Sequence, residues 1–148
     1  PSMARYLAAR DLAGEGWPEL RTRLLDQLRA DGGGWMGGRA QAEIFLHEGL
    51  IDDAITVANR DGYGVLELVM DAAIATRPQW VITKAVAKAA GIMNSGKAQH
   101  YDQAAGWLRR ARDAYRAAGQ TEAWERHIAD VRATHGRKYK LMALLKGL

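Results

Sequence analysis

Small and apolar residues recur three and four positions apart through most of this chain, which is the spacing of one face of an α-helix. The clearest case is the segment 101–119, where most positions on the opposite face are arginine. Gly119 supplies a stop signal and Thr121 is placed to cap a following helix, so two amphipathic helices are expected to fold back on each other. The predicted buried face of the first helix comprises Tyr101, Ala104, Ala105, Leu108, Ala111, Tyr115 and Ala118. The segment therefore predicts a helical hairpin.

The same spacing predicts further helices before and after this hairpin, each ending near glycine or proline. Two helices precede a glycine-rich run at 31–38, and the second of them opens at Pro18, a favoured first helical position. Two short helices flank Gly49, two more flank Pro78, and the tail 138–148 carries leucines at helical spacing. The predicted buried positions on either side of Pro78 are Val65, Leu68, Val69, Ala72 and Thr76, and then Ile82, Val86, Ala89, Ala90 and Met93.

The predicted fold class is all-α, because about nine short helices result and no segment shows the period-two alternation of a β-strand. The helices are short, rich in alanine and joined by tight turns. A tetratricopeptide-like α-solenoid of stacked antiparallel hairpins therefore fits better than an irregular bundle. Residues 1–148 are expected to form a single helical-repeat domain, in which residues 1–3 (Pro1-Ser2-Met3) resemble a tag remnant.

Composition narrows the classes of protein to which the chain can belong. There is no cysteine, so the chain forms neither a disulfide nor a thiolate zinc site. The longest apolar runs are far short of the roughly 20 residues that a membrane-spanning helix needs. The N-terminal segment lacks the charged start and apolar middle of a secretory signal, so the expected address is the cytoplasm.

Charge is distributed unevenly along the chain. Residues 1–74 carry 7 Lys+Arg and 12 Asp+Glu, a net charge of −5, whereas residues 75–148 carry 14 and 5, a net charge of +9. A basic half favours nucleic acid or an acidic protein partner. The charges equally allow docking on the acidic half of a second copy or on an acidic neighbouring domain, so the partner and the oligomeric state stay open.

Three arginines are predicted to share the exposed face of the helix at 101–119. Arg109, Arg112 and Arg116 lie three and four positions apart, with Arg110 beside them and Asp113 placed to pair with Arg109 or Arg116. A solvated helix face with local salt bridges explains the pattern most simply. A binding surface for an acidic ligand is the alternative.

Two further features are candidates for recognition. Arg137, Lys138 and Lys140 surround Tyr139, a combination that suits phosphate contact together with stacking of a ring on a base. Trp35 lies in the glycine-rich run, where no helical face can bury it. It is therefore expected either to dock into a groove of its own chain or to act as a recognition side chain.

Several matches to enzyme motifs fail on their context. The segment 91–98 resembles a phosphate-binding loop, but Ala98 replaces the hydroxyl residue that coordinates magnesium, and the preceding segment is predicted to be helical. The run 32–37 matches the bare dinucleotide-binding pattern, yet it follows a helix and not a strand. Glu43 and His47 are spaced to chelate a metal, but no third ligand is evident. No catalytic, cofactor-binding or metal-binding residue is predicted, and the chain is not expected to be an enzyme.

The C-terminal half contains a set of runs that match a known helical region: PQWVITKA, IMNSGKAQHYDQAAGWLRRARDAYRAAG, EAW and HGRKYKLMALLKGL. These runs, of which RKYKLMALL is the most specific, resemble the region that follows the zinc module in bacterial SWIM zinc-finger proteins. The resemblance implies a cytoplasmic, non-enzymatic helical-repeat region attached to a zinc module thought to serve nucleic-acid or protein contacts. The zinc signature itself is absent, so the chain looks like the C-terminal part of a longer protein, and no function of the zinc module transfers to a residue here.

Three functional hypotheses follow. The preferred one is a helical-repeat scaffold for protein–protein interaction, whose concave face receives a peptide or domain and whose arginine face contacts an acidic ligand. The alternative is an accessory nucleic-acid-binding module that uses the basic half. A nucleotide-dependent enzyme built on 91–97 is the least favoured.

Overall fold

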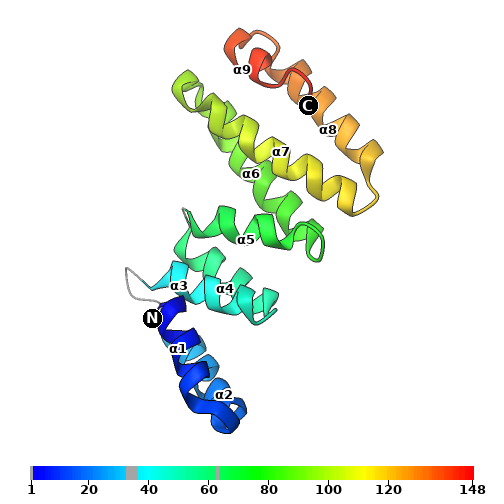
Figure 1. Cartoon of the computed structure of the whole chain (residues 1–148). Coiled ribbons are helices and arrows are strands. Elements are labelled where there is room, and N and C mark those ends of the chain that lie inside the picture. The colour runs from blue at the N-terminus through cyan, green and yellow to red at the C-terminus, as the bar shows by residue number, and fades with distance from the viewer. Residues whose placement is uncertain (1, 33–36, 63) are drawn as a thin grey trace. The chain divides into compact units, whose positions relative to one another are not determined.

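The computed structural model describes residues 2–32, 37–62 and 64–148, and every regular element within these ranges is helical (Figure 1). The prediction of an all-α fold is therefore confirmed. The chain divides into two compact units, Pro1–Ala72 and Ala73–Leu148. The expectation of one helical-repeat domain over residues 1–148 stays a prediction. Within the described ranges, no helix combines the length and the apolar character that crossing a membrane requires.

The first unit contains five α-helices in its described residues. They are α1 (Met3–Ala13), α2 (Trp17–Ala30), α3 (Gly38–His47), α4 (Ile51–Asp61) and α5 (Val65–Ala73, whose last residue belongs to the second unit). α1 packs against α2 and α3, and α3 packs along α4. Pro18 lies in the first turn of α2, as predicted. Gly62 ends α4 with a φ of 69°, a conformation that glycine adopts without the steric cost of a Cβ atom.

A buried amide holds the centre of this unit together. Gln41 on α3 is fully buried, and its Nε2 donates a hydrogen bond to the carbonyl oxygen of Asp31 at 3.1 Å. Its Oε1 accepts a hydrogen bond from Arg60 on α4 at 2.8 Å. The amide therefore joins the end of α2 to α3 and α4 with its polar atoms satisfied, as a buried polar group requires.

The second unit contains α6 (Pro78–Ser95), α7 (Tyr101–Ala117), α8 (Thr121–His135) and α9 (Tyr139–Leu144). α6 and α7 lie side by side and run in opposite directions, α8 returns along α7, and α9 packs on α7 and α8 (Figure 1). Gly96 ends α6 in the left-handed conformation, with a φ of 69°. Thr121 is the first residue of α8, and no described side chain caps that helix, so the predicted capping role of Thr121 is wrong.

The buried face of α6 differs from the predicted one. Val81 and Ala85 are fully buried, whereas Val86 and Ala90 are only half-buried. Ile82, Ala89 and Met93 are buried as predicted, so the prediction is wrong only for Val86 and Ala90. The small residues of α6 continue around most of the helix and leave the edge of its apolar stripe ambiguous.

In α7 the predicted Tyr101, Ala104, Ala105, Leu108 and Ala111 are buried, whereas the predicted Tyr115 and Ala118 are half-buried. Trp107 and Ala114 are buried and were not part of the predicted face. α7 packs against α6 on one side and against α8 and α9 elsewhere, so more than one stripe is covered.

The predicted face of α5 also needs correction. Val65 and Val69 are buried as predicted, whereas the predicted Leu68 is half-buried and Ala72 is exposed. Leu66, Met70 and Ala73 are buried and were not part of the predicted face. Thr76 lies beyond the end of the helix and is exposed. The short apolar run of this helix is compatible with several faces, and sequence spacing alone does not choose between them.

Candidate binding surface

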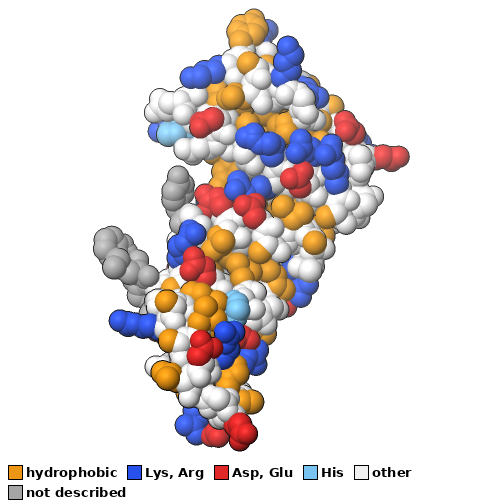
Figure 2. Space-filling view, in the orientation of Figure 1, with side chains coloured by type: hydrophobic (Ala, Val, Ile, Leu, Met, Phe, Trp, Pro, Cys, Tyr) orange, Lys and Arg blue, Asp and Glu red, His pale blue; other side chains and the backbone are white. Residues whose placement is uncertain are grey.

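The exposed face of α7 carries the predicted arginines. Arg109 and Arg116 are exposed, and Figure 2 shows Lys and Arg side chains gathered over this part of the second unit. Arg112 is less accessible, with 21% of its side chain exposed, and its Nε donates a hydrogen bond to Oδ1 of Asp113 at 3.1 Å. The predicted pairing of Asp113 with Arg109 or Arg116 is therefore wrong, because the adjacent Arg112 occupies its carboxylate. Within the described residues, Arg109 and Arg116 form no ion pair.

Arg110 is placed differently from its neighbours on α7. Its Cζ atom lies 5.2 Å from the ring centroid of Trp107, within the range of a cation–π interaction. Trp107 is 8% exposed, so the indole supports the guanidinium from the edge of the core. Arg110 is half-buried as a result and is held against the protein, whereas Arg109 and Arg116 extend into solvent.

The arginines of the first unit are neutralised to a much greater extent. Among the described residues, every arginine of that unit except Arg5 has a carboxylate oxygen within 3.3 Å. The pairs are Arg10–Asp11, Arg21–Glu48, Arg23–Glu19, Arg29–Asp26, Arg29–Asp53, Arg39–Glu43 and Arg60–Asp61. In the second unit, by contrast, Arg109 and Arg116 both lack a carboxylate partner among the described residues.

The second predicted basic group lies around the start of α9. Arg137 and Lys140 are exposed, and Tyr139 is 82% exposed, an unusual position for an aromatic ring. Lys138 is used within the protein: its Nζ donates a hydrogen bond to the carbonyl oxygen of Met93 and lies 2.9 Å from Nδ1 of His135. Lys138 therefore anchors α9 to the carboxyl end of α6, and its ammonium group is less available to a ligand than those of its neighbours.

The two basic groups do not form one patch. Lys138 reaches Met93, so the 137–140 segment lies at the end of the unit where α6 stops and α7 begins. Arg116 lies near the other end of α7, about 22 Å from Tyr101 along the helix axis at 1.5 Å per residue. Any ligand that contacts both groups must therefore span most of the length of α7.

A partly buried aromatic cluster links α7 to α8, and of its three members the sequence analysis had named only Tyr115, as part of the buried face. The rings of Tyr115, Trp124 and His127 lie with centroids 6.1 to 6.4 Å apart. Nε1 of Trp124 and Nε2 of His127 are buried and have no hydrogen-bond partner among the described residues. Burial lowers the pKa of His127, and the charge of Asp130 only partly opposes this effect. The cluster therefore favours a neutral imidazole.

The other candidates suggested by the sequence do not add to this surface. Trp35 lies outside the described residues, together with most of the glycine-rich run. The segment from Gly91 to Ser95 is part of α6, and a helix there does not provide the open loop that a phosphate-binding motif uses. Glu43 pairs with Arg39 at 3.0 Å. In the part of the chain that the structure describes, no group of three His, Asp or Glu residues is placed to hold a metal ion.

Comparison with known proteins gives no relative for this chain: no family model, curated protein or solved structure matches it. The class of protein is therefore described from the structure alone: an all-α chain in which α7 carries two exposed arginines, Arg109 and Arg116, without an ion pair among the described residues. The resemblance of the C-terminal half to the helical region of SWIM zinc-finger proteins stays a prediction.

Proposed function

We propose that this protein is a non-enzymatic helical-repeat scaffold that binds an acidic segment of a protein partner through the exposed face of α7. In this proposal its helices form stacked antiparallel hairpins of a tetratricopeptide-like solenoid. Arg109 and Arg116 contact carboxylates of the partner directly, and Arg112 contributes after exchanging its bond to Asp113 for one to the ligand.

One observation carries the proposal: Arg109 and Arg116 on α7 lack the carboxylate partners that most arginines of the first unit have among the described residues. An exposed ion pair contributes little to folding, so the absence of such pairs on α7 costs the protein almost nothing. It does leave a positive potential on one helix face, which attracts and orients acidic ligands. The net charge of +9 on residues 75–148 acts in the same direction.

Titration of a glutamate-rich peptide into the full chain tests the proposal. Replacing Arg109 and Arg116 by Gln should weaken binding roughly tenfold, since two exposed charge contacts contribute about 1–2 kcal/mol together. The matched control replaces Arg126 on α8 and Lys146 near the C-terminus by Gln, which removes the same net charge from the same unit. Equal weakening by the two double variants would mean that only net charge matters, and the α7 surface would be rejected.

A second candidate function, accessory binding of nucleic acid, is favoured by the exposed ring of Tyr139 between Arg137 and Lys140. Such a group can stack on an unpaired base while its cations contact phosphates. A random single-stranded oligonucleotide titrated over a salt series tests it, because phosphate contacts make affinity fall steeply with salt. If Tyr139→Ala and Lys140→Gln weaken oligonucleotide binding but leave peptide binding unchanged, the two functions occupy separate surfaces. No binding at low salt would remove this candidate.

We also propose that this chain is the C-terminal part of a longer protein. The resemblance of the C-terminal half supports a parent chain in which this cytoplasmic region follows a SWIM zinc module. The zinc module would then supply its own contacts, and the helical region would recruit the protein partner.

A further inference from the structure

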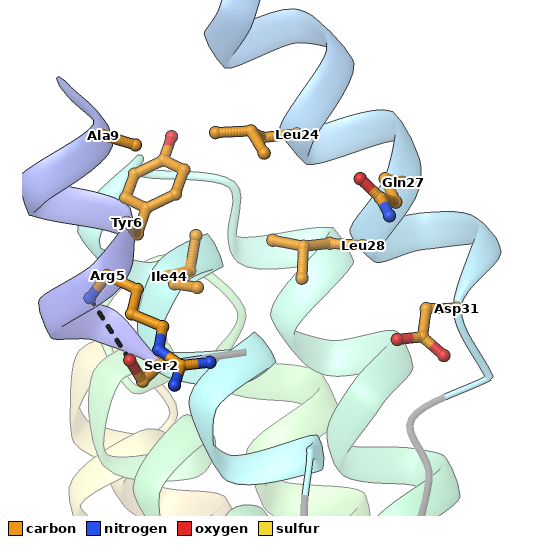
Figure 3. A pocket seen from close by; sticks show the side chains of 9 residues that line it. All are labelled: Ser2, Arg5, Tyr6, Ala9, Leu24, Gln27, Leu28, Asp31 and Ile44. Carbon is orange, nitrogen blue, oxygen red and sulfur yellow. Dashed lines mark hydrogen bonds between the residues drawn. The ribbon is translucent and has the colours of Figure 1, made fainter. Parts of the chain in front are cut away.

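The first unit contains a cavity of about 290 Å³ between α1, α2 and α3 (Figure 3). Its inner wall is largely apolar and includes Leu24 and Leu28 from α2, Ile44 from α3 and the ring of Tyr6 from α1. Leu24 and Leu28 are only partly covered by the protein, so they present apolar surface to the cavity. The volume is close to the lower end of the range of about 300–1,000 Å³ typical of small-molecule sites.

Charged side chains from two helices stand at the rim of this cavity. Arg5 comes from α1 and Asp31 follows the end of α2, and Leu28 and Ile44 lie between them in the view of Figure 3. Arg5 is the one arginine of the first unit that pairs with no carboxylate of the described residues. Asp31 forms no ion pair at 4 Å or less within the described chain, although its charge contributes to raising the pKa of Arg60 on α4. The cavity thus has a positive end, an apolar middle and a negative end.

We propose that this cavity binds a small molecule with an apolar body and a carboxylate, oriented with the carboxylate on Arg5. The apolar body lies on Leu24, Leu28 and Ile44, where its burial supplies most of the affinity. The guanidinium of Arg5 supplies charge-assisted hydrogen bonds that fix the orientation. Asp31 excludes a second anionic group at the opposite end and favours a neutral or cationic one. The ligand differs in class and in location from the acidic protein segment proposed for α7.

Four eight-carbon probes that differ only in their end groups test this assignment: octanoate, ω-aminooctanoate, octanedioate and octylamine. Binding to the full chain is followed by NMR through the methyl signals of Leu24, Leu28 and Ile44. Octanoate and ω-aminooctanoate should bind, and octanedioate should bind more weakly than either, whereas octylamine should bind in the reverse orientation with its ammonium group at Asp31. Equal binding of octanoate and octanedioate, or no shift of these methyl signals at millimolar probe, would overturn the proposal.

Substitutions separate the roles of the two charges. Arg5→Gln should weaken octanoate binding roughly tenfold, the effect of losing one charge-assisted hydrogen bond. Arg10→Gln, on the same helix but paired with Asp11, should leave binding unchanged. Asp31→Asn should restore octanedioate binding toward that of octanoate. Arg5 and Arg10 are exposed, so both variants should fold, and circular dichroism verifies this. Equal effects of Arg5→Gln and Arg10→Gln would contradict the assigned role of Arg5.

Replacing a small residue of the cavity wall by a larger one tests the location of the binding site without changing any charge. Ala9 also lines the cavity and lies on α1, where leucine is well tolerated by a helix. Ala9→Leu should occupy the apolar space and weaken binding of octanoate and ω-aminooctanoate alike. Unchanged binding by this variant would place the probes elsewhere and overturn the proposal.

Discussion

The hydroxyl group of Tyr6 donates a hydrogen bond of 2.5 Å to Oε1 of Glu48, 42 positions later in the chain. The other oxygen of Glu48 accepts a hydrogen bond from Nε of Arg21 at 2.6 Å. One carboxylate therefore joins α1, α2 and the end of α3. Burial opposes the ionisation of Glu48, yet the bonds from Tyr6 and Arg21 outweigh it and lower the pKa of this carboxyl. Burial and the same bond raise the pKa of Tyr6.

Removing the Tyr6 hydroxyl should destabilise the protein measurably. Tyr6 is 5% exposed, so Tyr6→Phe leaves Glu48 with one partner fewer in a poorly solvated place. The free energy of unfolding should fall by about 1–2 kcal/mol, as for other hydrogen bonds to charged groups. Tyr139→Phe is the control, since that ring is 82% exposed, and it should change stability by less than about 0.5 kcal/mol. Urea unfolding measures both, and equal effects would argue against the role assigned to the bond.

The lowered pKa of Glu48 predicts a specific dependence on pH. A carboxyl with a folded-state pKa below its ordinary value stabilises the fold above that ordinary value, and this contribution is lost as pH falls through the folded-state pKa. The difference in unfolding free energy between the wild type and Glu48→Gln should therefore be constant near neutral pH and shrink in acid. A difference that grows below pH of about 4 would contradict the prediction.

The buried histidines of the second unit predict a loss of stability at a different pH. Burial lowers the pKa of both His127 and His135, and the charge of Lys138 adds to the effect on His135. Their neutral forms suit the folded state, so stability should decline as pH falls below about 6.5, where the unfolded chain takes up the protons first. His127→Phe keeps a ring against Trp124 and should flatten the decline between about pH 5 and 7. An equally steep decline in the wild type and in His127→Phe would contradict the prediction.

Two neighbouring lysines at the start of α9 should behave differently on substitution. Lys138→Met removes the hydrogen bond to the carbonyl oxygen of Met93 and should cost about 1–2 kcal/mol of unfolding free energy. Lys140→Met removes an exposed side chain of the same type and should cost less than about 0.5 kcal/mol. Thermal unfolding of the two variants side by side decides between an anchoring and a purely surface role for Lys138.

Two helical glycines provide a matched pair for Ala substitution. A Cβ atom on Gly38 would overlap Oδ2 of Asp61, so Asp61 must move and Gly38→Ala should destabilise the first unit. Gly91 lies inside α6, and a Cβ atom at this position would meet no atom within 4 Å. Gly91→Ala should therefore stabilise the second unit by about 0.5–1 kcal/mol, measured by thermal unfolding. Stabilisation by both substitutions would show that Asp61 rearranges without cost.

Helix positions followed from local signals, whereas the partners of polar side chains did not. Pro18 and Pro78 lie in the first turns of α2 and α6 because of their own backbone preferences, so the sequence alone predicted these helix starts. The periodicity also predicted that Tyr101 and Leu108 are buried. It could not predict that Lys138 reaches Met93, because that contact depends on how α9 packs against a helix end 45 positions away in the chain.

On the arginine face of α7, too, the sequence predicted the positions of side chains on the helix but not their hydrogen-bond partners. Spacing alone placed Arg109 and Arg116 on an exposed face, because helix geometry fixes which side chains are neighbours. It did not predict that Asp113 pairs with Arg112, since the choice among nearby cations depends on side-chain rotamers. The cavity near Arg5 was invisible in the sequence, because its walls come from three helices and its charge stands out only when the other arginines are seen to be paired.

The position of Trp107 beneath Arg110 gives the α7 surface an intrinsic optical reporter. The guanidinium lies 5.2 Å from the indole, and an anion that draws Arg110 outward would change the polarity around a chromophore at the edge of the core. Emission from Trp107, isolated by comparison with Trp107→Phe, would then register occupancy of the neighbouring arginines without any attached dye.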